Sequence, residues 1–168
     1  MGIPAFRSRG VRWAACGVTA LILAADQLSK SLVIAARPRA GSGLVAVRLA
    51  RNTGASFGVG AGHPVLVMLV SAVVITVAAV VLARTSSRVV ALFLAAVLGG
   101  ALGNLADRLL RSPGLGRGAV IDWIHIAWYP PSFNVADVAV RAGAVGAITA
   151  MLASWTHLRH RLSQRQDM

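Results

Sequence analysis

Apolar residues along the chain gather in four long runs, separated by polar segments rich in glycine, proline or arginine. The runs cover about residues 12–36, 64–83, 89–110 and 134–156. A helix rises about 1.5 Å per residue, so about 20 apolar residues cross the hydrocarbon core of a bilayer. The pattern therefore predicts an all-α membrane protein with four transmembrane helices.

Two segments between these runs are too polar and too often broken by glycine and proline to cross a membrane. Residues 37–62 contain an alternating stretch at 44–50, which predicts one or two β-strands closing on a glycine-bearing turn, with an unstructured loop as the alternative. Residues 111–131 contain an apolar stretch at 119–126, which predicts either a strand or an interfacial helix.

Composition supports the membrane interpretation. Hydrophobic residues make up 57% of the chain and charged residues 13%, and the mean hydropathy is +0.71; soluble domains have about 25% charged residues. A soluble domain of buried helices is the alternative, but the apolar runs reach spanning length. The length of 168 residues suits one domain, residues 1–168.

The net charge of +12 comes from arginines spread through termini and loops, with few aromatic residues between them. This distribution favours attraction to membrane phospholipid and predicts no nucleic-acid partner. The single cysteine, Cys16, excludes an intramolecular disulfide and is expected to act as a small buried residue.

Arginines also predict the orientation. The arginine-rich N-terminus resembles the start of a cleavable signal peptide. Apolar residues resume after Lys30, however, which favours an uncleaved first span. Arginines near both termini and in the loop at 84–88 outnumber those in segments 37–62 and 111–131, so both termini are predicted to be cytoplasmic and these two segments to lie outside.

All five carboxylates are aspartates, and four of them fall in or beside the apolar runs. In the predicted topology Asp26, Asp107, Asp122 and Asp137 converge on the outer leaflet. An ionisable group at membrane depth costs several kcal/mol, so such residues usually serve a function. Asp26 and Lys30 are four residues apart, and one helix face would pair their charges.

Two carboxylates held close together share one proton, and such a pair acts as general base and general acid on a single water. Asp122 lies between two apolar residues, which favours a raised pKa, whereas Arg108 directly follows Asp107 and favours a permanently ionised, structural carboxylate. Asp137 follows Asn134, a predicted N-cap whose amide could orient it. Spacing therefore favours Asp122 and Asp137 as the pair.

Other chemistries fit less well. A serine nucleophile, Ser29 or Ser56, with Lys30 as its base is the first alternative. The sequence argues against it, because Ser29 and Lys30 are adjacent and do not share a helix face. Asp122 and His125 are only two scattered candidate metal ligands, so no metal and no cofactor are expected. A small proton-coupled transporter is the alternative class, but transport sites usually lie at the bilayer midplane between repeats.

Five motifs occur in order along the chain, in and between the four runs. They are Asp26-Gln-Leu-Ser-Lys30, Asn52-Thr-Gly-Ala-Ser-Phe-Gly58, Gly99-Gly-Ala-Leu-Gly-Asn-Leu-Ala-Asp-Arg108, Val120-Ile-Asp-Trp123 and Phe133-Asn-Val-Ala-Asp137. Together these motifs resemble bacterial lipoprotein signal peptidase, also called signal peptidase II. The resemblance implies an aspartyl endopeptidase of the bacterial cytoplasmic membrane, with its active site near the outer leaflet. It also implies that the enzyme removes signal peptides from diacylglyceryl-modified prolipoproteins, cutting before the lipid-bearing cysteine.

Carried over by motif, the resemblance implies that Asp122 and Asp137 are catalytic. It also implies a β-cradle formed by residues 37–62 and a short, mobile interfacial helix within 111–131. The stretch between Arg108 and Asp122 is longer than usual, and Trp123 replaces a more familiar phenylalanine, so the shape of the outer loop is open. A monomer is expected. The supporting or substrate-binding residues would be Asp26, Lys30, Asn52, Gly54, Asn104, Asp107, Arg108 and Asn134.

Overall fold

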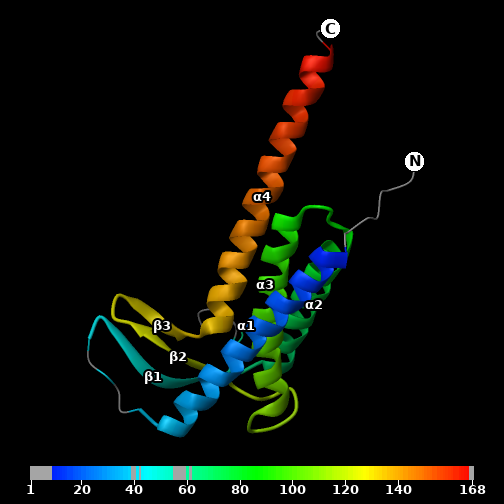
Figure 1. Cartoon of the computed structure of the whole chain (residues 1–168). Helices are drawn as coiled ribbons and strands as arrows, with labels where there is room; N and C mark the ends of the chain where they lie inside the picture. Colours follow the sequence, from blue (N-terminus) through cyan, green and yellow to red (C-terminus); the bar gives the residue numbers. More distant parts are fainter. Residues whose placement is uncertain (1–8, 39–40, 42, 55–59, 61, 167–168) are drawn as a thin grey trace.

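The structure, a computed structural model, describes residues 9–38, 41, 43–54, 60 and 62–166. Four helices form a bundle, a small sheet lies at one end of it, and both ends of the described chain lie at the other end (Figure 1). In chain order the elements are α1 (Arg9–Ala36), β1 (Val45–Asn52), α2 (Pro64–Arg84), α3 (Arg88–Leu110), β2 (Val120–Ile126), β3 (Tyr129–Phe133) and α4 (Val135–Gln166).

Each of the four helices contains an apolar stretch long enough to cross a membrane, which confirms the predicted fold class. Helix α1 begins at Arg9, slightly earlier than expected. Helix α4 continues to Gln166, although its apolar stretch ends at Thr156. The chain is therefore a multi-pass membrane protein, and its last helix extends beyond the span.

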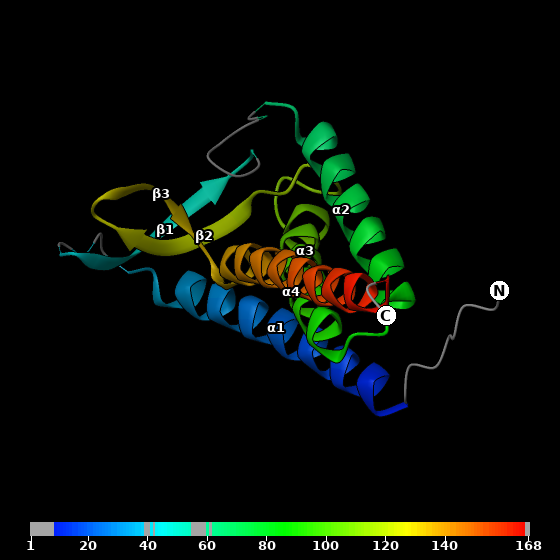
Figure 2. The same cartoon turned by 90° about the horizontal axis from the view of Figure 1, so that it is seen from above.

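Helix α3 is the centre of the bundle. Of its apolar stretch 56% is buried, against 17%, 11% and 17% for α1, α2 and α4. Helices α1 and α2 lie on different sides of it (Figure 2). The outer faces of the other three helices keep their valines and leucines exposed, as expected where lipid replaces protein as the apolar neighbour.

Glycines allow the helices to approach α3 closely. A Cβ atom at Gly99 of α3 would lie 2.8 Å from the carbonyl oxygen of Thr19 in α1, and one at Gly143 of α4 would lie 2.8 Å from that of Phe93 in α3. The Thr19 hydroxyl uses this approach to donate a hydrogen bond to the Ala95 carbonyl at 3.0 Å. Small residues therefore allow α1 and α4 to pack closely against α3.

Cys16 is exposed on α1, so the expectation of a buried cysteine is wrong. Helix α1 packs against α3 with one face only, and Cys16 lies on the rim of that face, where it lines a shallow hollow with Leu82 and Leu98.

The sheet is antiparallel, in the order β1, β2, β3. Residues 37–62 contribute a single described strand, β1, which pairs with β2 from the second outer segment. The interfacial helix expected within 111–131 is not formed, because that segment makes turns and then strands β2 and β3. Strand β2, Val-Ile-Asp-Trp-Ile-His-Ile, is rich in β-branched and aromatic residues, and pairing with two neighbours satisfies its backbone.

Candidate active site

Asp122 lies on β2, the central strand, with only 3% of its surface exposed. The register places Ala50 of β1 opposite Asp122. Alternate residues of a strand share a face, so Asn52 projects to the same side as Asp122. The Asn52 side-chain amide donates a hydrogen bond to Asp122 Oδ2 at 3.0 Å.

Asp137 lies in the first turn of α4, where Asn134 caps the helix. The Asn134 side-chain oxygen accepts a hydrogen bond from the Asp137 backbone N–H at 2.9 Å, and Asp137 Oδ2 accepts one from the Asn134 backbone N–H at 3.4 Å. This reciprocal arrangement is a capping box, and it confirms the predicted N-cap. The cap holds the Asp137 carboxylate at the helix N-terminus, where the helix dipole favours negative charge.

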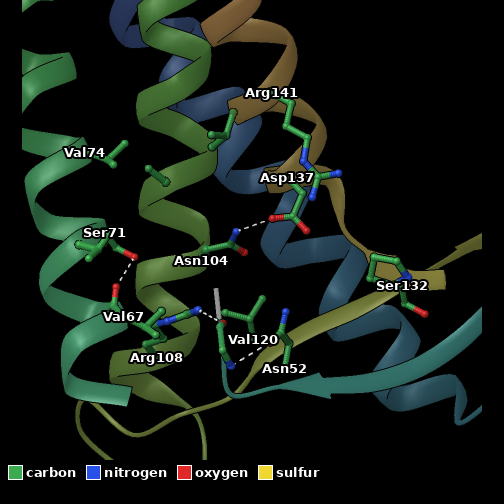
Figure 3. A pocket seen from close by; sticks show the side chains of 15 residues that line it. Asn52, Val67, Ser71, Val74, Asn104, Arg108, Val120, Ser132, Asp137 and Arg141 are labelled. Atoms are coloured by element: carbon green, nitrogen blue, oxygen red, sulfur yellow. Dashed lines mark hydrogen bonds between the residues drawn. The ribbon is translucent and has the colours of Figure 1, made fainter. Parts of the chain in front are cut away.

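Side-chain amides connect the two aspartates. Asn134 is fully buried, and its Nδ2 lies 2.6 Å from Asp122 Oδ1 and 3.2 Å from Asn104 Oδ1. Asn104 in turn donates a hydrogen bond from Nδ2 to Asp137 Oδ1 at 2.9 Å (Figure 3). Two carboxylates from different elements are thus held in one network by Asn104 and Asn134.

Burial raises the pKa of Asp122 from its ordinary value to about 6. The charge of Asp137 contributes to this rise, while the hydrogen bonds from Asn52 and Asn134 partly oppose it because they favour the ionised form. This agrees with the raised pKa expected from the apolar sequence neighbours of Asp122. Asp122 is therefore suited to hold a proton in mildly acidic conditions.

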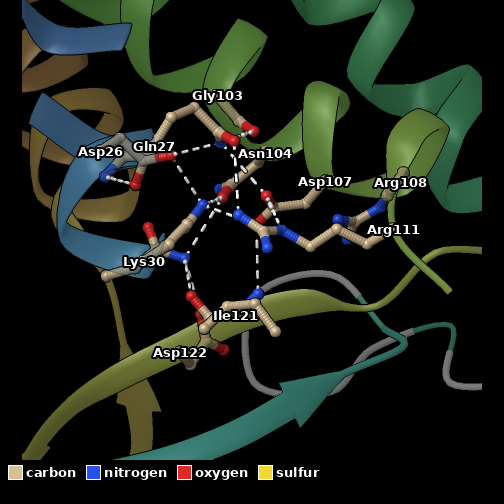
Figure 4. Close-up of polar contacts among 12 residues, drawn as sticks. Asp26, Gln27, Lys30, Gly103, Asn104, Asp107, Arg108, Arg111, Ile121 and Asp122 are labelled. Atoms are coloured by element: carbon tan, nitrogen blue, oxygen red, sulfur yellow. Dashed lines mark hydrogen bonds and ion pairs between the residues drawn. The ribbon is translucent and has the colours of Figure 1, made fainter. Parts of the chain in front are cut away.

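A second polar cluster lies beneath the pair, between α1 and α3 (Figure 4). Lys30 Nζ is 2.7 Å from Asp26 Oδ2 and 2.8 Å from Asp107 Oδ2, and all three side chains are fully buried. Arg111 Nε pairs with the other oxygen of Asp107 at 2.6 Å. The predicted pairing of Asp26 with Lys30 is confirmed, and two acids and two bases balance the charge of the cluster.

The cluster also holds the backbone next to both aspartates. Asp107 Oδ2 accepts a hydrogen bond at 3.1 Å from the N–H of Ile121, which precedes Asp122. Asp26 Oδ1 accepts one at 3.0 Å from the N–H of Ala136, which precedes Asp137.

Lys30 acts on the amide network itself. Its Nζ donates to Asn104 Oδ1 at 3.0 Å, which leaves the amide Nδ2 of Asn104 facing Asp137.

Arg108 of α3 contacts Gly54, which follows β1, at the edge of the site. Arg108 is 5% exposed, and its Nη2 donates to the Gly54 carbonyl at 2.6 Å. Its Nη1 is buried and makes no hydrogen bond to any described residue. The Gly54 N–H donates to Asn52 Oδ1 at 2.9 Å, so the amide of Asn52 turns its Nδ2 toward Asp122.

A cavity of about 270 Å³ lies beside the pair (Figure 3). Asp137 lines it, and Asp122 accepts a hydrogen bond from the lining residue Asn52. Its lining contains both polar and apolar side chains, which suits an amphipathic ligand. The polar lining includes Asn52, Asn104, Arg108, Ser132, Asp137 and Arg141, and the apolar lining includes Val67, Val70, Val74, Ala101, Val120 and Val140.

The other chemistries considered from the sequence find no support here. Ser29 donates to the Asp26 carbonyl at 2.9 Å, and Ser56 lies outside the described residues. The His125 ring lies 3.5 Å from the Ser132 hydroxyl, and odd spacing along β2 places it on the face opposite Asp122. In the described part of the chain, no three His, Cys, Asp or Glu side chains gather as a metal site would require.

Sequence reasoning missed Arg141 and Ser132 in the cavity lining, and Tyr129, whose hydroxyl contacts Arg141. Arg141 offered a usable indication, because it is a cation inside the fourth apolar run and follows Asp137 by four residues. Ser132 and Tyr129 offered none, because their position depends on the pairing of β3 with β2.

Four spanning helices, with two amide-linked aspartates beside a cavity of mixed polarity, define a multi-pass membrane protein with a candidate acid–base site. The family model for signal peptidase (SPase) II matches residues 18–153. The chain therefore belongs to the signal peptidase II family and is a membrane peptidase.

Individual relatives agree with this assignment. The lipoprotein signal peptidase of Rhodococcus jostii (strain RHA1) is 42% identical over 134 residues, covering 76% of this chain and 67% of the relative. That of Mycobacterium avium (strain 104) is 36% identical over 133 residues, covering 76% and 72%.

Two solved structures, each described as a bacterial membrane enzyme, share the fold at 22% identity. Their TM-scores are 0.72 and 0.67, and the matches cover 85% and 82% of this chain and 90% and 92% of theirs.

Proposed function

We propose that this peptidase removes signal peptides from diacylglyceryl-modified prolipoproteins, cutting before the lipid-bearing cysteine, with Asp122 and Asp137 as the catalytic pair. The observation that carries the proposal is the amide network: Asn134 Nδ2 lies 2.6 Å from Asp122, and Asn104 Nδ2 lies 2.9 Å from Asp137. Those hydrogen bonds hold both carboxylates beside one cavity in fixed orientations, as acid–base catalysis on a bound water requires.

The two aspartates divide the work. Asp122 is the more buried and has the raised pKa, so it carries the shared proton and donates it to the carbonyl oxygen of the scissile peptide bond. Asp137 lines the cavity and takes a proton from the attacking water. That proton then passes to the leaving amine as the C–N bond breaks, and the hydroxyl formed from the carbonyl oxygen returns its proton to Asp122, which completes the cleavage without a covalent intermediate.

Arg108 and the apolar residues that line the cavity bind the substrate. The partnerless Nη1 of Arg108 is an available donor for a substrate main-chain carbonyl, and a buried cation stabilises the negative charge that develops in the transition state. The valines of α2 and α4 provide a surface for acyl chains. Lipid anchoring then contributes through proximity, because it presents the peptide bond at the depth of the pair.

The proposal places the pair near the outer leaflet of the bacterial cytoplasmic membrane, with both termini cytoplasmic, phospholipid around the bundle and the protein a monomer. The arginine distribution supports this orientation, and so does the location of the sheet at the end of the bundle opposite the ends of the described chain (Figure 1).

The test is cleavage of a purified diacylglyceryl-modified prolipoprotein peptide beside its unlipidated twin, with and without EDTA. We expect the modified peptide to be cut before the lipid-bearing cysteine, equally well with EDTA, and the twin to stay intact. Folded protein that cuts neither peptide contradicts the proposal, and a proton-flux assay in liposomes would then examine the transporter alternative.

A further inference from the structure

The shallow hollow that Cys16 lines lies on the surface of the bundle between α1 and α2, and is called the α1–α2 hollow below. Its volume is about 420 Å³. Both helices pack against α3 and make few contacts with each other, so a gap stays between them, lined by Leu82 of α2 and Leu98 of α3. The start of α1 and the end of α2 lie at the end of the bundle opposite the sheet (Figure 1). The α1–α2 hollow shares no lining residue with the cavity beside the paired aspartates.

Helix α1 lines the α1–α2 hollow with one stripe of its surface. Four residues with spacings of four, three and four form the stripe: Arg12, Cys16, Thr19 and Leu23. The Thr19 hydroxyl is bonded to the Ala95 carbonyl, so Arg12 is the only charged group along the stripe. Between Arg12 and Leu23 the helix rises about 16 Å, which is close to half of the roughly 30 Å hydrocarbon core. The stripe is therefore about as long as the acyl chains of one leaflet, with a cation at the end nearest the start of α1.

The charge at this end of the bundle calls for an anion. The Arg12 side chain is exposed and makes no hydrogen bond or ion pair within the described part of the chain. The carboxylates of the described residues all belong to the site at the other end. Guanidinium groups bind phosphate oxygens through parallel N–H donors. Three more exposed arginines lie at the same end as Arg12: Arg9, Arg84 and Arg88.

An anionic phospholipid matches both the charge and the length of the stripe. Its phosphate would reach Arg12, while one acyl chain would run along the apolar residues toward Leu23. Other occupants match less well. The helix of a signal peptide begins with positive residues, which Arg12 would repel. A second copy of this chain, inserted in the same orientation, would bring its own arginines to the same depth.

We propose that the α1–α2 hollow binds one anionic phospholipid from the leaflet at that end of the bundle, with the phosphate on Arg12 and an acyl chain along Cys16, Thr19 and Leu23. The bound lipid fills the gap between α1 and α2, which the protein itself leaves open. The site is separate from the paired aspartates, so the inference does not depend on the proposed function.

Cys16 makes occupancy measurable, because it lines the α1–α2 hollow and is the single cysteine of the chain. The experiment places one copy of the protein in each nanodisc, replaces phosphatidylcholine stepwise with phosphatidylglycerol, and measures the rate at which N-ethylmaleimide alkylates Cys16. The rate should fall as phosphatidylglycerol rises, since an acyl chain then covers the thiol. Arg12→Gln should need about tenfold more phosphatidylglycerol for the same protection, the factor expected for one charge-assisted hydrogen bond.

Three controls make the result specific. Arg9→Gln removes a cation at the same end but outside the lining, and should leave the protection of Cys16 unchanged. Val77→Cys in a Cys16→Ala background puts the thiol on an exposed face of α2, seven residues before Arg84 as Cys16 is seven after Arg9, and its alkylation should not depend on phosphatidylglycerol. Glycerophosphoglycerol, which is the headgroup without acyl chains, should not protect Cys16.

Equal alkylation of Cys16 in every lipid mixture overturns the inference. Protection that Arg12→Gln leaves unchanged also overturns it, because the anion would then bind elsewhere. Protection by glycerophosphoglycerol alone would indicate a phosphate site without a lipid, and protection that rises with the number of copies per disc would assign the hollow to a second copy. Either result contradicts a bound phospholipid, and none of these results bears on peptide cleavage.

Discussion

Asp26 and Asp107 support the site indirectly, since each accepts a hydrogen bond from the backbone N–H just before one of the paired aspartates. Asp122 belongs to strand β2 and Asp137 to helix α4, and strand β3 connects these two elements. The buried ion cluster thus fixes the position of both backbones relative to α1 and α3. Such preorganisation is what a catalytic constellation requires of its surroundings.

We expect Asp122→Asn and Asp137→Asn each to give folded, membrane-inserted protein with activity lowered by at least about a thousandfold. Asparagine keeps the size of aspartate and one of the two hydrogen bonds that each carboxylate accepts, but it cannot transfer the proton. The measurement is cleavage of the diacylglyceryl peptide by purified variants whose thermal unfolding matches wild type. Near wild-type cleavage by either variant would rule out that residue as catalytic.

The pH profile should report the raised pKa of Asp122, which is about 6. In the proposed mechanism the acid form of Asp122 is the active one, so kcat/KM should fall as the pH rises through this value. Asn52→Ala removes a hydrogen bond that favours the ionised form. Its loss raises the pKa, so the falling limb should move to higher pH. Thr53→Ala, at an exposed neighbouring position, is the control and should leave the limb in place; a limb that Asn52→Ala does not move contradicts the assignment of the acid.

Lys30→Met should destabilise the protein by about 3 kcal/mol or more, because it leaves the buried Asp26 and Asp107 without the cation between them. The measurement is thermal or denaturant unfolding in detergent. Arg117→Met, which removes an exposed cation, should change stability by less than about 0.5 kcal/mol. Equal stability of the two variants would show that the ion cluster does not hold the bundle together.

At the scale of elements, close packing on α3 depends on glycine. Gly99→Ala should destabilise the fold by about 1–3 kcal/mol, because its methyl group meets the Thr19 carbonyl and the Ile22 side chain and forces α1 away. Gly17→Ala is the matched control, since nothing lies within 4 Å of a Cβ there and alanine favours helix. Comparable unfolding temperatures for the two variants would contradict the role of Gly99.

The helices and the outer segment differ in how far the sequence predicts them. An apolar run of spanning length has few alternatives to a helix, since lipid leaves no other partner for its backbone, and all four runs form helices as expected. The segment at 111–131 carries no comparable constraint. Its stretch at 119–126 suits a strand or an interfacial helix equally, and pairing with β1, from a distant part of the chain, decides for the strand.

The same contrast holds for the site. Asp122, Asp137 and Asn134 could be selected from spacing and motifs because their chemistry is local to short stretches. The orientation of Asn104 could not, because it depends on Lys30 of another helix.

At the scale of the whole molecule, the orientation can be measured with introduced cysteines in a Cys16→Ala background. Leu115→Cys lies in the loop after α3, 84% exposed, and Ser86→Cys lies in the loop between α2 and α3. We expect a membrane-impermeant maleimide to label the Leu115→Cys variant in intact spheroplasts. The Ser86→Cys variant should be labelled only after lysis. The opposite pattern would invert the proposed topology.

Both α2 and α4 pack against α3, and the cavity takes its lining from all three helices. For a bilayer-dissolved substrate, the relevant concentration is its mole fraction in the membrane plane. Adding inert lipid at constant total substrate should therefore slow the reaction by surface dilution, whereas changing the aqueous volume should not. The enzyme samples its substrates in two dimensions, and the density of prolipoprotein in the membrane sets its working rate.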